Sequence, residues 1–244
     1  KTKVFAELFG IHPFSSLQDF IGSDEVDAVY VATPHSDHFV YALEAIKYKK
    51  HVLCEKPLTM NAHESMILLD LAQSSNVFLM EAYMYRTHPQ TLNILNNLHL
   101  LTETNKKILI EGSFGFKGDV PVDHRLRNPL LGGGAILDVG CYPLSMSKLI
   151  AGHLQGTAFA EPHSISATGR FDATGVDLQS DAHLIFSESI EAKISCAIDE
   201  ELSNQLVIAS GEVSITVPQP WHCGQFQGGQ SSITIVNESG LVEE

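Results

Sequence analysis

Three short apolar runs alternate with two helical patterns in the first third of the chain, and this alternation restricts the fold more than any other feature. The runs cover residues 26–33, 51–54 and 77–80, and the helical patterns cover 36–48 and 61–75. Strands that alternate with helices over short links form parallel sheets with right-handed crossovers. The first run, VDAVYVAT, is almost continuously apolar, which predicts a strand covered on both faces. We therefore expect a doubly wound α/β sheet here.

The helix over 61–75 has a clear starting signal. Asn61 precedes the apolar pattern and Glu64 follows three residues later, which is typical of a capping box. The buried face that the pattern predicts consists of Met66, Ile67, Leu69 and Leu71.

The pattern changes to consecutive strands after about residue 105. A glycine-rich turn followed by a helix is expected over 131–152, and strands are expected over 108–116, 163–171, 177–187, 190–199, 204–209, 212–217 and 232–236. Successive strands at this spacing predict a mostly antiparallel sheet. We expect two domains: a partial doubly wound parallel sheet over 1–95, and an α+β domain with a mostly antiparallel open sheet over 96–244.

Composition excludes several classes of partner. The formal net charge of −14 argues against nucleic acid and anionic membranes, because both carry negative charge. No apolar run approaches the ~18 residues of a membrane span, and the start of the chain lacks the apolar core of a signal peptide. The cysteines lack the close spacing of a disulfide framework or a zinc site: Cys54, Cys141, Cys196 and Cys223. We expect reduced thiols, no bound metal and a cytoplasmic location.

Polar residues follow the first two strands at their carboxyl ends, where sheets of this kind bind ligands. Pro57 lacks an amide proton and restricts Lys56 to extended conformations. An amine held at this edge could orient a hydroxyl group or lower the pKa of a neighbouring acid, so we predict such a role for Lys56. The alternative is a surface lysine and histidines that cap a helix or fill the core. The candidates at this edge are Thr33, Pro34, His35, His38, Glu55, Lys56 and Pro57.

A second group of candidates lies in LDVGCYP. Asp138 and Tyr142 are four residues apart, so they share a face if this segment is α-helical. Glycines 132–134 would let the backbone approach a ligand closely. A tyrosine has an ordinary pKa near ~10, and an ammonium such as that of Lys56 would lower it toward the range needed for proton transfer. The alternative makes Tyr142 a core aromatic residue and Asp138 a partner of the helix dipole.

Further residues are candidates for ligand contacts. Arg86 could meet an anion or a ribose, and a substrate pocket could be lined by Arg125, Arg127 and Trp221. A structural role is the alternative for each of them.

Segments along almost the whole chain resemble the Gfo/Idh/MocA family of nicotinamide-dependent oxidoreductases. The combination of EKP with GGGAILDVGCY is specific to that family. Tyr142 stands where many relatives carry a histidine, which is similar to the branch of dihydrodiol dehydrogenases, glucose-fructose oxidoreductase and xylose-type dehydrogenases. The matching segments, in family order, are VDAVYVATPHSDH, KHVLCEKPL, FLMEAYMYRTHPQ, HRLRNPLLGGGAILDVGCYP and ATGVDLQSDAHLIF.

The resemblance implies a Rossmann-type first domain and hydride transfer between NAD or NADP and a sugar, polyol or trans-dihydrodiol. Lys56 would be the catalytic lysine, with a cis bond to Pro57, and Tyr142 would exchange the hydroxyl proton. Asp138 would orient the substrate or the proton relay. The residues at the strand ends, together with Arg86, would contact the cofactor, although His35 replaces an asparagine of many relatives. The second domain would bind substrate and form a homodimer or homotetramer through its open sheet face.

The sequence departs from the family at its start. The family's GxGxxG phosphate loop and the segment that reads the cofactor's 2′-position are absent, so NAD cannot be told from NADP. By comparison with the family, ~40 residues are missing, and we expect a piece of a longer enzyme. The alternative is a relative that has lost its cofactor site and acts as a non-catalytic sugar or nucleotide sensor. An NAD-dependent glycosidase of the same fold is a further alternative.

Overall fold

The computed structural model describes residues 2–223, 231–237 and 240–243, which form two compact units. The first unit covers residues 1–82 and the second covers 83–244. The sequence-based boundary, between residues 95 and 96, falls inside helix α5 (Pro89–Asn97). Tyr85 and Ile94 of this region are buried in the core of the second unit, which explains why the division comes earlier in the chain.

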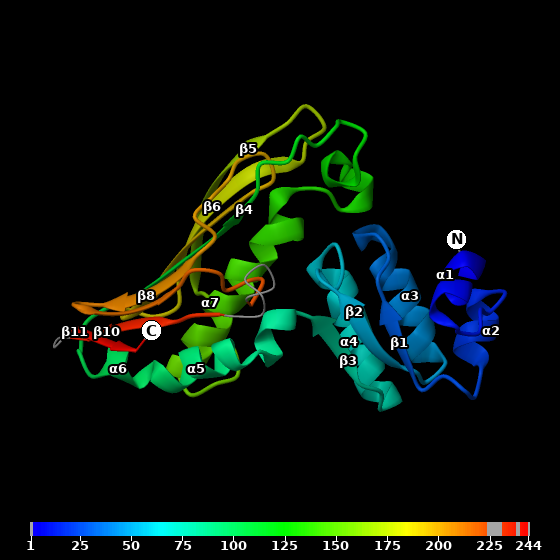
Figure 1. The fold of residues 1–244 in the computed structure, drawn as a ribbon, viewed down its shortest axis with the longest axis horizontal. Helices are drawn as coiled ribbons and strands as arrows, with labels where there is room; N and C mark the ends of the chain where they lie inside the picture. The colour runs from blue at the N-terminus through cyan, green and yellow to red at the C-terminus, as the bar shows by residue number, and fades with distance from the viewer. Residues whose placement is uncertain (1, 224–230, 238–239, 244) are drawn as a thin grey trace. The chain divides into compact units, whose positions relative to one another are not determined.

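The described part of the first unit contains a sheet of three strands in the order β1–β2–β3 (Figure 1). Both strand pairs are parallel, as predicted. The elements follow the expected alternation after two initial helices: α1 (Thr2–Phe9), α2 (Leu17–Gly22), β1 (Ala28–Val31), α3 (His35–Lys47), β2 (His51–Glu55), α4 (Ala62–Ser75) and β3 (Leu79–Ala82).

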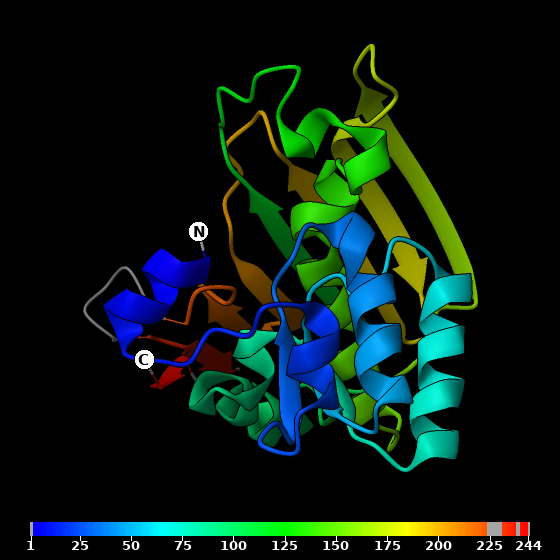
Figure 2. The ribbon, with the colours of Figure 1, turned by 90° about the vertical axis from the view of Figure 1, so that its right-hand side faces the viewer.

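Helices α3 and α4 lie side by side against one face of this sheet (Figure 2). Val29, Val31 and Val52 are buried beneath them. The expectation that β1 is covered on both faces is wrong, because Tyr30 on the opposite face is 57% exposed and Leu53 is 40% exposed. Two successive right-handed crossovers in the same direction place both helices on the same face, which leaves the other face without them.

The predicted inner face of α4 is also partly wrong. Leu68 and Ala72 are the buried residues of this helix, whereas Met66 and Leu69 are exposed. Leu68 and Ala72 are four residues apart and therefore share one face of the helix, and this face packs into the core of the first unit.

The second unit is built on a long twisted sheet, with eight strands among its described residues (Figure 1). Their order is β11–β10–β9–β8–β4–β7–β6–β5. In the described residues β4 pairs in parallel with β7 and the other pairs are antiparallel, which confirms a mostly antiparallel sheet. The strands are β4 (Ile108–Gly115), β5 (Ser164–Phe171), β6 (Asp177–Ile185), β7 (Ile190–Ala197), β8 (Leu206–Ser210), β9 (Val213–Val217), β10 (Thr234–Asn237) and β11 (Gly240–Glu243).

Helices cover one face of this sheet and enclose the core. Met146 and Ile150 of the long helix α7 are fully buried against β4 and β7. The helical elements of the unit, besides α5, are η1 (Met84–Thr87), α6 (His99–Thr102), η2 (Arg125–Arg127), η3 (Pro129–Leu131), the π-helix η4 (Ile136–Gly140) and α7 (Cys141–Leu154). Across the described residues of both units, no helix has the length and apolar character needed to cross a membrane.

Candidate active site

The carboxyl ends of β1 and β2 are tied together by one histidine. His38 is fully buried in the first turns of α3. Its Nε2 lies 2.9 Å from the carbonyl oxygen of Thr33, and its Nδ1 lies 2.8 Å from the carbonyl oxygen of Pro57. The predicted candidates after the two strands are therefore brought to one edge of the sheet. Both ring nitrogens of His38 are engaged by backbone.

Lys56 leads out of β2 into a fixed turn. The peptide bond between Lys56 and Pro57 is cis, and Pro57 is buried. Lys56 is half-buried, and its backbone amide nitrogen lies 3.4 Å from Oε2 of Glu55. After the proline, the amide of Leu58 donates to Oε1 of Glu81 at 2.8 Å, which anchors the turn to β3.

Glu55 is engaged by the neighbouring strand. The hydroxyl of Tyr30 donates a hydrogen bond to Oε1 of Glu55. This hydrogen bond, followed in effect by burial, raises the pKa of Tyr30 to about 12. Tyr30 therefore stays a hydrogen-bond donor near neutral pH, and it holds the carboxylate of Glu55 in place next to Lys56.

Two other candidates at this edge have different surroundings. His35 is 7% exposed, and its ring centroid lies 5.7 Å from that of His38. The hydroxyl of Thr33 is buried and has no hydrogen-bond partner within the part of the chain that the structure describes. Pro34 is exposed and forms the N-cap of α3.

The second unit carries Asp138 on an unusual helical turn. Residues 136–140 form a π-helix that runs directly into α7. The assumption of α-helical spacing between Asp138 and Tyr142 is therefore wrong, because i→i+5 hydrogen bonds add a residue to the turn. Asp138 is 8% exposed, and both terminal nitrogens of Arg125 lie 3.4 Å from its Oδ1. The structure thus brings together two predicted site residues from different segments.

Tyr142 lies in a cluster of aromatic rings and is 7% exposed. The ring of Phe114 meets it edge-on at 5.2 Å between centroids, and that of Tyr83 does so at 5.5 Å. Trp221 has its ring centroid 6.2 Å from that of Tyr142. It is 1% exposed, and its indole N–H donates to the carbonyl oxygen of Ser113 at 2.7 Å. This cluster fixes the Tyr142 ring through edge-to-face packing.

The two remaining arginine candidates make contacts inside the second unit. Arg86 lies over the rings of Phe159, at 4.5 Å, and Tyr83, at 5.1 Å, and it donates to the hydroxyl of Ser145. Arg127 donates from Nε to Oδ2 of Asp172 at 2.7 Å and from Nη1 to the carbonyl oxygen of Val120 at 3.2 Å. Both arginine side chains therefore have structural roles within the second unit, whether or not they also contact a ligand.

The candidates divide between the two units. Lys56 belongs to the first unit, whereas Asp138 and Tyr142 belong to the second. The pairing of Lys56 with Tyr142 stays a prediction. Among residues 2–223, 231–237 and 240–243, no group of three or more His, Cys, Asp or Glu side chains is arranged to hold a metal ion.

Sequence reasoning missed residues that support the site. Asp177 accepts a hydrogen bond from the backbone of η4, and Tyr85 donates to the carbonyl oxygen of Tyr142 at 3.4 Å. The tyrosines of EAYMYR offered a signal, because aromatic residues this close in the sequence often pack together, and the ring centroids of Tyr83 and Tyr85 lie 5.6 Å apart. Asp177 gave none, because its partner lies forty-one positions away in the sequence.

Comparison with known proteins gives consistent matches. The model of an oxidoreductase family with an NAD-binding Rossmann fold matches residues 1–83. A trans-1,2-dihydrobenzene-1,2-diol dehydrogenase of Danio rerio is 35% identical over 86% of this chain and 60% of its own length. A D-xylose 1-dehydrogenase (NADP(+)) of Haloferax volcanii is 30% identical over 76% of this chain and 54% of its own length. The chain thus spans less than two thirds of these relatives.

Solved structures share the fold. The aldose-aldose oxidoreductase of Caulobacter crescentus, complexed with glycerol, aligns with a TM-score of 0.84 at 21% identity and covers 100% of this chain and 72% of its own. The 3-ketoreductase KijD10 of Actinomadura kijaniata, with NADP and TDP-benzene, aligns with a TM-score of 0.81 at 24% identity and the same coverage. The motif segments, the paired α/β and α+β units and the sequence relatives together show that this chain belongs to the Gfo/Idh/MocA family of oxidoreductases.

Proposed function

We propose that the protein transfers hydride between NAD or NADP and a secondary alcohol or carbonyl of a sugar, polyol or trans-dihydrodiol. The observation that supports this most strongly is the edge at which His38 links the ends of β1 and β2 beside Lys56. Dehydrogenases of dihydrodiols and of xylose are among the sequence relatives. The dihydrodiol and the sugar in the names of these relatives guide the substrate class proposed here.

The residues at this edge fit the nicotinamide end of a cofactor. The buried hydroxyl of Thr33, which lacks a partner among the described residues, offers a polar group at the position where such sheets bind ligands. The bound cofactor would supply the hydride acceptor or donor. The residues proposed to hold it are Thr33, Pro34, His35, His38, Glu55, Lys56, Pro57 and Arg86, with His38 acting through the backbone that follows β1 and β2.

Side chains of the protein would transfer the proton of the substrate hydroxyl. The ionised Tyr142 side chain would take the proton from the substrate alcohol, and in the reverse direction its protonated hydroxyl would donate a proton to the carbonyl oxygen. The ammonium of Lys56 would hydrogen-bond the same oxygen and favour the ionised form of Tyr142 by its charge. Asp138, whose carboxylate is paired with Arg125, would orient the substrate. Arg125, Arg127 and Trp221 are proposed to line the substrate side.

The test follows nicotinamide absorbance in the intact protein with NAD and NADP, using aldoses, polyols and trans-dihydrodiols. Lys56→Met and Tyr142→Phe should each lower kcat by ~10²-fold or more, the usual contribution of a proton-transfer group. Lys47→Met and Tyr48→Phe are matched controls on the exposed end of α3 and should leave kcat unchanged.

Three outcomes would contradict the proposal. Turnover that both site variants leave intact would remove Lys56 and Tyr142 from the chemistry. Ligand binding without turnover of any of these substrates would favour a sensor. Cleavage of aryl glycosides without net consumption of the cofactor would favour a glycosidase.

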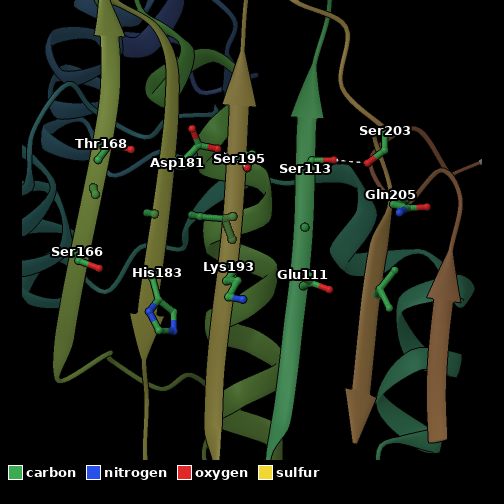
Figure 3. Close-up of a pocket in the computed structure, with 15 residues that line it drawn as sticks. Glu111, Ser113, Ser166, Thr168, Asp181, His183, Lys193, Ser195, Ser203 and Gln205 are labelled. Atoms are coloured by element: carbon green, nitrogen blue, oxygen red, sulfur yellow. Dashed lines mark hydrogen bonds between the residues drawn. The ribbon is translucent and has the colours of Figure 1, made fainter. Parts of the chain in front are cut away.

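We also propose a cytoplasmic homodimer or homotetramer that binds neither nucleic acid nor membrane. The charge of −14 supports the exclusion of polyanionic partners, and no disulfide joins the four cysteines, all of which lie among the described residues. The face of the large sheet opposite α7 would form the contact between copies. Figure 3 shows polar side chains projecting from the adjacent strands β4, β7 and β6 on that face, among them Glu111, Lys193, Asp181 and His183.

A further inference from the structure

The start of β6 reaches the helix that carries the proposed proton-transfer residues. Oδ2 of Asp177 accepts a hydrogen bond from the amide of Ile136 at 2.8 Å and another from the hydroxyl of Ser180 at 3.2 Å. Ile136 is the first residue of η4, two positions before Asp138. A carboxylate from a strand thus takes the position that an N-cap residue holds in an ordinary helix.

Gly134 makes room for this carboxylate. A Cβ atom on Gly134 would lie 2.2 Å from Oδ1 of Asp177, which is far inside van der Waals contact. Gly134 also has a φ of +117°, a conformation that other residues rarely adopt. The glycine is therefore required twice, by its own backbone and by the side chain that packs against it.

Partial burial of the Asp177 carboxylate disfavours its charged form. Burial raises the pKa of Asp177, and the amide of Ile136 and the hydroxyl of Ser180 oppose that shift. The first amides of a helix carry partial positive charge and stabilise a carboxylate placed on them. The carboxylate and the helix start therefore stabilise each other, and removing either leaves a buried polar group without its partner.

The hairpin formed by β5 and β6, which carries Asp177, also contacts the loop before η4. Asp172, in the turn between β5 and β6, accepts the 2.7 Å hydrogen bond from Arg127. The hairpin therefore holds the segment from Arg127 to Ile136 at both of its ends. This segment leads directly to Asp138 and Tyr142.

We propose that Asp177 is a positioning residue, which sets the orientation of η4 and the start of α7 and thereby places Asp138 and Tyr142 for proton transfer. This inference rests on the proposed function for its catalytic part. Its structural part, the control of the helix start by a carboxylate from β6, can be tested without any turnover.

The experiment uses the intact protein with Asp177→Asn, Asp177→Ala and Gly134→Ala. The matched control is Asp199→Asn, which removes the surface pair between Asp199, just after β7, and Arg170 of β5. Hydrogen exchange of the amides over 135–141 should be on the order of 10-fold faster in the Asp177 variants and in Gly134→Ala, because a charge-assisted hydrogen bond is lost or displaced. The control should exchange as the unchanged protein does.

Kinetics then distinguish positioning from stability alone. With the substrate and cofactor that the unchanged protein turns over, kcat should fall by ~10- to 100-fold in Asp177→Ala, since small misplacements of reacting groups have effects of this size. Asp177→Asn, which keeps one acceptor oxygen, should recover part of that loss.

Each contrary result has a definite meaning. Unchanged exchange over 135–141 overturns the inference, whether or not the protein shows turnover. Faster exchange with unchanged kcat overturns the positioning role. Absence of turnover in the unchanged protein counts against the proposed function, while exchange still decides whether Asp177 controls the helix start.

Discussion

His38 shows how one buried side chain can hold two loops. Its two ring nitrogens face the carbonyl oxygens of Thr33 and Pro57, and neither oxygen can donate. Both contacts are hydrogen bonds only when the ring carries two protons, whereas the neutral ring can donate to one oxygen alone. The sequence indicated a functional edge at Thr33 and Lys56. It could not show that His38 connects them, because this depends on how far α3 rotates over the sheet.

His38→Ala should lower the free energy of unfolding by about 3 kcal/mol, through a lost hydrogen bond, an unsatisfied buried carbonyl and a cavity. Urea denaturation followed by circular dichroism measures this. His63→Ala is the matched control, because His63 is exposed on α4, and its effect should stay within about 0.5 kcal/mol. Equal effects of the two substitutions would show that the buried contacts of His38 add nothing to stability.

Asp172 supplies a pH-dependent contribution to stability. Hydrogen bonds from the Thr174 hydroxyl and from Arg127 lower the pKa of Asp172 to about 2. A carboxyl group with a lowered pKa in the folded state stabilises the fold above its unfolded pKa of ~3.9, and this contribution is lost as pH falls toward 2. Asp172→Asn should therefore unfold more easily than the unchanged protein at pH 7. The difference in stability should shrink between pH 4 and pH 2, as denaturant titrations at several pH values would show. A difference that is constant over this range would contradict the assigned ion pair.

At the scale of elements, periodicity predicted strands and helices well but located their buried faces less well. The three strands of the first unit and most strands of the second lie where alternation placed them. The inner face of α4 was predicted from Met66 and Leu69, whereas Leu68 and Ala72 are buried. A helix with apolar residues on several sides has no single inner face in its sequence, and contacts with the sheet and α3 decide the outcome.

The π-turn at 136–140 lies beyond what periodicity can show, because an inserted residue shifts the helical face without changing the residue types. The turn packs against β7 and is contacted by Asp177, and both partners are distant in the sequence. This element sets the directions in which Asp138 and Tyr142 leave the helix. The sequence could therefore predict which residues belong to the candidate site better than it could predict their geometry.

The start of α4, by contrast, is decided locally and offers a clean test. The side chain of Asn61 accepts a hydrogen bond from the amide of Glu64 at 3.0 Å, which confirms the predicted N-cap. The return bond differs from a capping box, because Glu64 accepts from the amide of Met60, at 3.3 Å, and not from that of Asn61. Asn61→Ala should lower the free energy of unfolding by about 1 kcal/mol. Asn61→Asp keeps the acceptor and should restore most of that loss in the same denaturation assay. A loss that aspartate fails to restore would assign the effect to something other than the cap.

At the scale of the whole molecule, the alternation of elements predicted both sheets but not which residues of one unit meet the other. Lys56 and Tyr142 come from different units, and their proposed partnership depends on an arrangement that no local pattern contains. The same holds for the surface of the large sheet. A strand sequence shows which side chains share a face, but polar side chains suit both solvent and a wet interface between subunits.

The open face of the large sheet can be tested as an interface between copies. The groove there is about 630 Å³ and is lined by mixed charges and hydroxyls, including Asp181, Ser195 and Lys193. In a self-complementary contact, acidic and basic groups of one copy can meet their opposites on the second.

Size-exclusion chromatography with light scattering on the intact protein at micromolar concentration should give the mass of a dimer or tetramer. Ser195→Arg places a bulky cation in the middle of the face, breaks the 2.6 Å hydrogen bond from Ser195 to Asp181, and should shift the mass toward the monomer. Ser74→Arg, on the exposed side of α4, should leave it unchanged. A monomeric unchanged protein, or an oligomer that Ser195→Arg leaves intact, would reject this face as the contact.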